Sequence, residues 1–78
     1  MEVVKRYQIV ARAELTGADL SRCALDAVDL SQAVLRKACL VESSLSMANL
    51  SGADLSGADL SNADLSQVNF RNALLLDA

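Results

Sequence analysis

Apolar residues recur at every fifth position over most of the chain. Two residues before each of them stands a small residue, which is alanine except at Cys23, Val28, Ser43 and Val68. We predict that the every-fifth residues form the core of the protein. They are Leu15, Leu20, Leu25, Leu30, Leu35, Leu40, Leu45, Leu50, Leu55, Leu60, Leu65, Phe70 and Leu75.

A period of five fits neither an α-helix nor a flat strand. On a helix, successive leucines would be rotated by about 140°, and on a strand they would alternate between the two faces. One geometry buries them all: Ala-x-Leu points both apolar side chains inward, and the next two residues turn the chain. Those two positions are rich in turn-forming residues, as in Thr16-Gly17 and Ser51-Gly52. The pattern therefore predicts a polygonal coil whose successive turns hydrogen-bond at about 4.8 Å spacing.

The repeated five-residue words carry a family resemblance. Residues 13–17, 18–22 and 53–57 read AELTG, ADLSR and ADLSG, and they resemble the A(D/N)LXX motif of pentapeptide-repeat proteins. The resemblance covers thirteen consecutive words, residues 13–77. It implies an all-β fold, a right-handed quadrilateral β-helix with four words per coil and about three coils. The residue pattern alone leaves three or four sides open, because the exceptions to the alanine rule fall into two columns in either case.

The first twelve residues precede the repeat, and we expect them to form an N-terminal cap on a β-helix that occupies 13–78. Val3, Tyr7 and Val10 are spaced i, i+4, i+7, which suits a short helix or strand lying over the first coil. Val10 would be the centre of a degenerate first word. A short basic recruitment peptide is the alternative interpretation.

The length and charge of the chain exclude several classes of protein. Seventy-eight residues make a single domain, and the net charge of −3 at pH 7 argues against direct nucleic-acid binding, which needs clustered Lys and Arg. No apolar run is long enough to span a membrane, so no membrane association is expected. No signal-peptide core follows the start, and we expect a cytoplasmic protein.

An aspartate or asparagine often precedes the repeated leucine. In the coil this position points outward and consecutive words face about 90° apart, so Asp54, Asp59 and Asp64 belong to three different sides. A catalytic carboxylate pair or a metal site needs side chains that converge. We therefore interpret the acids as solvating and turn-forming residues. The alternative, suggested by the family, is an acidic DNA mimic that binds a DNA-handling enzyme such as DNA gyrase.

The two cysteines do not indicate catalysis. Cys23 is at an inward position, where it fills space, and Cys39 is at an outward one. Since the chain has no histidine, it has no Cys-His pair, and two cysteines on opposite sides of a wall make no zinc site. We expect no enzyme activity, no cofactor and no metal.

Apolar residues at outward positions are the remaining candidates for an interaction surface. Val34, Val41 and Met47 occupy outward positions of the second coil, and Leu74 and Leu76 occupy outward positions in the last word. Because the end of a solenoid exposes core and unpaired strand edges, we expect a homodimer through the C-terminal coil. The alternative is a cap formed by further residues. The function we predict is a non-enzymatic structural or protein-interaction module with an unknown protein partner.

Overall fold

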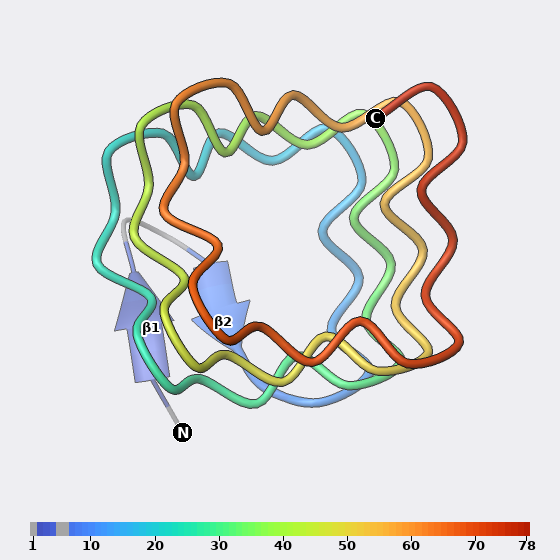
Figure 1. Ribbon diagram of the computed structural model, residues 1–78, viewed down its shortest axis with the longest axis horizontal. Coiled ribbons are helices and arrows are strands. Elements are labelled where there is room, and N and C mark those ends of the chain that lie inside the picture. Colours follow the sequence, from blue (N-terminus) through green and yellow to red (C-terminus); the bar gives the residue numbers. More distant parts are fainter. Residues whose placement is uncertain (1, 5–6) are drawn as a thin grey trace.

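The chain winds as a right-handed coil with four sides (Figure 1). The computed structural model describes residues 2–4 and 7–78, and their side chains from residue 7 onward. Each bridging residue pairs in parallel with the residue twenty positions later: Glu14 with Val34, Val34 with Asp54, and Asp54 with Leu74. Twenty residues, or four words, therefore complete one coil. The quadrilateral β-helix is confirmed.

We number the four faces of the coil in chain order, beginning with the right-hand side of Figure 1. Each face is a stack of five-residue segments spaced by about 4.8 Å. Face 1 consists of residues 13–17, 33–37, 53–57 and 73–77, face 2 of 18–22, 38–42 and 58–62, face 3 of 23–27, 43–47 and 63–67, and face 4 of 28–32, 48–52 and 68–72.

Neighbouring coils are joined by a regular pair of backbone hydrogen bonds. On face 1 the N–H of Val34 donates to the carbonyl of Ala13 at 2.8 Å, and the N–H of Leu15 donates to the carbonyl of Val34 at 2.7 Å. Each pairing covers one residue, because the chain turns after every Ala-x-Leu. Among the described residues the only longer strands are therefore β1 (Glu2–Val4) and β2 (Tyr7–Ile9), which pair antiparallel ahead of the coil.

Every described corner is a tight turn, and all but one are closed by a backbone hydrogen bond. The N–H of Ala18, for example, donates to the carbonyl of Leu15 at 3.0 Å. At the exception the N–H of Cys23 donates to Ser43 Oγ, whose hydroxyl donates to the carbonyl of Leu20. The second central residue of each turn has a positive φ, as in a type II turn. Glycine takes this position only at Gly17, Gly52 and Gly57, and eleven other corners place a non-glycine residue at φ between 57° and 64°. The coil thus tolerates a backbone conformation that L-residues otherwise avoid.

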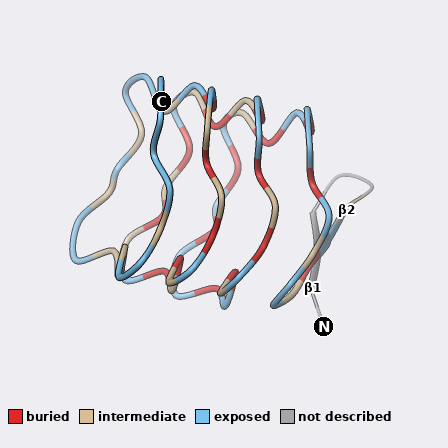
Figure 2. Cartoon of the chain, turned by 90° about the vertical axis from the view of Figure 1, so that its right-hand side faces the viewer, coloured by how far each residue is buried: buried red, intermediate tan, exposed pale blue. Residues whose placement is uncertain are grey.

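The core is a column of leucines, and buried residues become fewer toward the C-terminal end (Figure 2). The repeated leucines from Leu15 to Leu55 are all buried. Leu60, Leu65 and Phe70 are only partly buried, and Leu75 is 42% exposed. A leucine in the middle of the stack packs between those of the coils before and after it, and for these four the described residues include no later coil. The expectation of a uniform core therefore needs correction at Leu75.

The strand β2 contributes to the start of the core. Ile9 is buried, and Tyr7 packs against the same cluster. Val10 accepts the first corner hydrogen bond, from the N–H of Ala13 at 3.2 Å, but it is only half-buried. Ile9, rather than Val10, supplies the buried side chain at this end, because the chain enters the coil from a hairpin. The side chain of Val3 lies outside the described residues.

Candidate functional site

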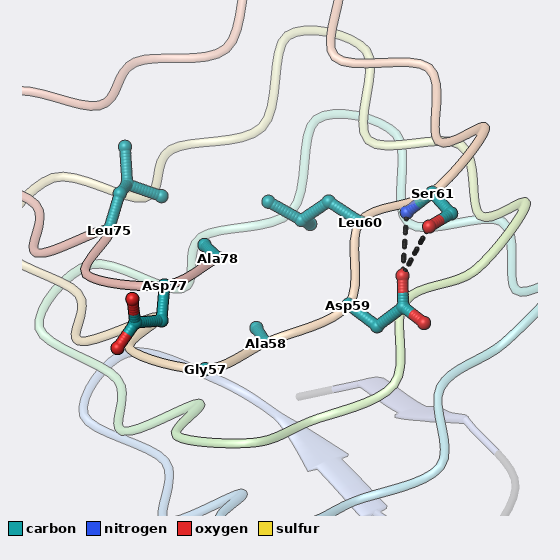
Figure 3. A pocket seen from close by; sticks show the side chains of 8 residues that line it. All are labelled: Gly57, Ala58, Asp59, Leu60, Ser61, Leu75, Asp77 and Ala78. Atoms are coloured by element: carbon teal, nitrogen blue, oxygen red, sulfur yellow. Dashed lines mark hydrogen bonds between the residues drawn. The ribbon is translucent and has the colours of Figure 1, made fainter.

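The outward acids are local turn formers. Oδ1 of Asp59 accepts hydrogen bonds from the backbone N–H of Ser61, at 3.0 Å, and from its hydroxyl (Figure 3). This arrangement closes the corner that follows the leucine. It recurs at Glu14–Thr16, Asp19–Ser21, Asp29–Ser31, Asn49–Ser51, Asp54–Ser56 and Asp64–Ser66.

These hydrogen bonds stabilise the ionised carboxylates. The serine hydroxyl, followed by the serine backbone N–H, lowers the pKa of Asp29, Asp54, Asp59 and Asp64 below its ordinary value of 3.8. Thr16 lowers the pKa of Glu14 in the same way. A general acid needs a raised pKa near the working pH. The shifts here go in the opposite direction and indicate a structural role.

The stacking of coils separates the acids rather than gathering them. Asp29 lies below Asn49 and Asn69 on face 4, whereas Asp19 and Asp59 are separated by Cys39 on face 2. Within residues 7–78, no group of three His, Cys, Asp or Glu side chains could hold a metal ion. The acids therefore do not form a shared chemical site in the described part of the chain.

Both cysteines are free thiols in different surroundings. Cys23 is buried, and its Sγ donates to the carbonyl of Ser21 at 3.4 Å. Ser43 occupies the same inward column one coil later, where its hydroxyl donates to the carbonyl of Leu20. Cys39 is half-buried on face 2. The inward and outward positions assigned to Cys23 and Cys39 agree with this burial.

The outward apolar residues lie on three faces. Val34 on face 1 and Val41 on face 2 are half-buried, and Met47 on face 3 is 62% exposed. Leu74 and Leu76 on face 1 are 53% and 69% exposed. The fold therefore brings only Leu74 and Leu76 together as a strongly exposed apolar pair.

These two leucines border a groove on face 1, the face turned toward the viewer in Figure 2. The groove has a volume of about 340 Å³. Arg36 Nη1 lies 3.8 Å from Asp54 Oδ2 on its wall. The groove is lined by Arg36, Lys37, Asp54, Ser56, Gly57, Leu74, Leu76 and Asp77.

The sequence pattern did not predict that the basic residues Arg36 and Lys37 lie beside these leucines. Arg36 and Lys37 are forty residues from Leu76 and Asp77, and only a twenty-residue coil places them in the same columns. The spacing could have been found by writing the sequence in rows of twenty, once four sides were assumed.

A second recess lies at the open end of the last coil (Figure 3). It has a volume of about 540 Å³ and includes the partly buried Leu60 and the exposed Leu75. Its lining residues are Gly57, Ala58, Asp59, Leu60, Ser61, Leu75, Asp77 and Ala78. The recess exists because the coil ends as a ramp, with residues 58–60 one level below residue 78.

The comparisons with known proteins agree with this geometry. The family model for pentapeptide repeats matches residues 13–52 and 48–78. The pentapeptide repeat protein Rfr23 from the cyanobacterium Cyanothece 51142 superposes with a TM-score of 0.80 and 30% identity over 83% of this chain and 45% of its own. No curated protein matches the chain in sequence.

Two further pentapeptide repeat proteins of known structure are similar in sequence. One, from the thylakoid lumen of Arabidopsis thaliana, is 37% identical over 81% of this chain and 47% of its own, with a TM-score of 0.42. The other, from Nostoc Pcc 7120, is 40% identical over 82% of this chain and 61% of its own, with a TM-score of 0.36. The present chain spans less than two thirds of each of the three.

Proposed function

Because this chain belongs to the pentapeptide-repeat family, we propose that it is a non-enzymatic protein-interaction module that self-associates through its C-terminal coil. Its rigid four-sided stack presents side chains on flat faces, a geometry suited to contact with another protein. Function on such a fold depends on local surface sites, and the C-terminal coil is where the apolar surface gathers.

The observation that carries the proposal is the distribution of exposed large apolar residues. Among the described residues there are four, and three of them are the consecutive Leu74, Leu75 and Leu76. Exposed apolar residues that stand alone are ordinary on a protein surface, whereas exposed leucines that lie together, as Leu74 and Leu76 do beside the groove, favour an interaction site. The fourth, Met47, lies alone on face 3.

Sedimentation equilibrium over a concentration series tests the proposal. The wild type is expected to approach a dimer mass at high concentration, and a Leu74→Asp, Leu76→Asp double variant is expected to stay monomeric. Met47→Asp is the matched control, because Met47 is similarly exposed but lies on face 3. A wild type that stays monomeric at every concentration would rule out self-association.

The alternative role, an acidic mimic of DNA that binds a DNA-handling enzyme such as DNA gyrase, has less support from the surface. Duplex DNA presents a continuous negative charge along its length. Here Arg22 and Glu42 pair at 3.1 Å on face 2, Arg36 lies beside Asp54 on face 1, and Arg71 is exposed on face 4. A gyrase supercoiling assay with excess protein would test this role, for which we expect no effect.

The compartment remains a prediction. None of the described residues forms a helix with the length and apolarity needed to cross a membrane. We propose a cytoplasmic location, and note that the Arabidopsis relative is a thylakoid lumen protein. Fractionation of the native host with an antibody to this chain would decide between compartments.

A further inference from the structure

We infer that the groove on face 1 is a self-complementary docking surface for a second copy of this chain, with the two coils side by side and their axes antiparallel. This inference rests on the proposed self-association and specifies its geometry. It places the contact on a side face of the coil, at Leu74 and Leu76, rather than on the open end at Leu60 and Leu75.

The groove is organised as three rows, one for each coil. The lowest row carries the basic pair Arg36 and Lys37, and the highest carries the apolar pair Leu74 and Leu76. The middle row contributes Asp54, Ser56 and Gly57, which have small or polar side chains and form the floor. Since the rows are spaced by about 4.8 Å, the basic and apolar rows lie about 10 Å apart on one flat face.

One cation and one anion of the groove lack an ion-pair partner among the described residues. Arg36 lies beside Asp54, with Nη1 3.8 Å from Oδ2. Lys37 and Asp77 stand in the same corner column, two coils apart, and neither has an ion pair within 4.0 Å in the described part of the chain. The surface therefore offers a positive charge at one end and a negative charge at the other.

The side chain of Lys37 also presents an apolar stem. Its Cγ lies 3.3 Å from the point that a Cβ on Gly57 would occupy, so the stem crosses the bare backbone of that glycine. Lysine and arginine stems readily cover apolar surface while the charged group stays in water. The basic row is thus suited to receive the leucines of another copy.

A two-fold axis that lies between the two copies, parallel to face 1 and running along the middle row, brings these features together. The rotation places the leucine row of each copy over the basic row of the other, and it brings Asp77 of one copy near Lys37 of its partner. A two-fold interface requires such self-complementarity, because the same patch is used on both sides. The contact repeats twice, so one leucine row and one Lys37–Asp77 pair lie on each side of the axis, and the polar middle rows face each other at the axis.

The mixed charge favours a second copy over an acidic peptide or a fatty acid. An anionic ligand would find Lys37, but it would also meet the carboxylates of Asp54 and Asp77 in the same groove. A second copy supplies a cation for Asp77 and an anion for Lys37 at once. Charge complementarity of this kind selects the partner and the register of an interface.

The size of the face limits the strength of the dimer. With principal extents of 26 × 23 × 21 Å, face 1 can bury at most roughly 500 Å² per copy, below the ~800 Å² per partner of a stable interface. We therefore expect a weak dimer that forms at high protein concentration.

A charge exchange tests the geometry. Lys37→Asp and Asp77→Lys are each expected to raise the dimer dissociation constant by about tenfold, because each creates two like-charge contacts, and the double variant is expected to restore it to within about threefold of wild type. Residues 37 and 77 have φ values of 59° and 58°, so the exchange is neutral for the backbone. Arg71→Asp on face 4 is the charge-matched control. Thermal unfolding of each variant checks that the coil remains folded.

The outcomes separate the geometry from the function. If the wild type dimerises but the single variants dimerise equally well, the side-by-side arrangement is wrong while self-association stands. If the single variants weaken the dimer and the double variant does not recover, residues 37 and 77 do not face each other and the arrangement is likewise overturned. If the wild type is monomeric throughout, both the arrangement and the proposed function fail.

Discussion

Ser61 donates two hydrogen bonds to the same oxygen of Asp59, one from its backbone N–H at 3.0 Å and one from its hydroxyl. The two residues bracket Leu60, so the acid that precedes a core leucine also closes the turn that follows it. Because these bonds favour the ionised form, they lower the pKa of Asp59. Charge, turn and core position are therefore linked within a single five-residue word.

This linkage predicts a loss of stability in acid. The carboxylates have a lower pKa in the folded chain than in the unfolded one, where it is near 3.8. Their contribution to stability is complete above the unfolded pKa and is lost as the pH falls through the folded pKa. The urea midpoint is expected to be level near neutral pH and to fall with acidification below about pH 4.

A triple variant Asp54→Asn, Asp59→Asn, Asp64→Asn provides the control for this titration. Asn49 accepts the same two hydrogen bonds from Ser51, so the amide keeps the turn while removing the ionisable group. The triple variant should lose less stability on acidification than the wild type. Equal acid sensitivity of the two proteins would show that these carboxylates do not control it.

Inward and outward positions differ sharply in what they tolerate. Leu50 and Ala53 are fully buried. Ala53→Leu overpacks the core, which typically lowers the free energy of unfolding by about 1–3 kcal/mol. Leu50→Asp buries an unpaired charge and is expected to lower it by more. Asp59→Ser, at an exposed position, loses only the hydrogen bonds from Ser61 and should lower the melting temperature much less than either inward substitution. Equal melting temperatures for the three variants would contradict the assignment of faces.

Two glycines allow backbone strain and side-chain crowding to be measured separately. Gly17 and Gly52 have φ of 70° and 69°. A Cβ at Gly17 would meet nothing within 4 Å, whereas at Gly52 it would lie 3.1 Å from Cγ of Gln32. Gly17→Ala is expected to cost about 1 kcal/mol through the left-handed backbone alone. Gly52→Ala should cost more in urea unfolding, and a smaller effect at Gly52 would argue against the crowding.

The reverse change should stabilise the coil. Ala27 occupies a corner with φ of 61°, and glycine adopts this conformation without the steric penalty. Ala27→Gly is therefore expected to raise the free energy of unfolding by up to about 1 kcal/mol. Ala24→Gly, three residues earlier and outside the positive-φ positions, is the matched control and should be destabilising. The prediction fails if the two substitutions change the urea midpoint in the same direction.

Several features of the fold could be predicted because they are local. The burial of Leu20 or Leu50 follows from its place in a five-residue word, and so does the turn that comes after it. The outward direction of Asp54 and its neighbours follows from the same pattern. Other features depend on residues far apart in the sequence. The partial exposure of Phe70 and Leu75, and the burial of Ile9 in place of Val10, depend on what lies above or below each segment.

By itself, then, the sequence determined which side chains face inward and where the chain turns, because both follow from five consecutive residues. Only the tertiary structure decided how many words complete a coil. The backbone hydrogen bonds between residues such as Val34 and Ala13 set that number at four, and it cannot be read from a repeat whose words are nearly alike. The same register places Lys37 in one column with Asp77 and creates the groove on face 1.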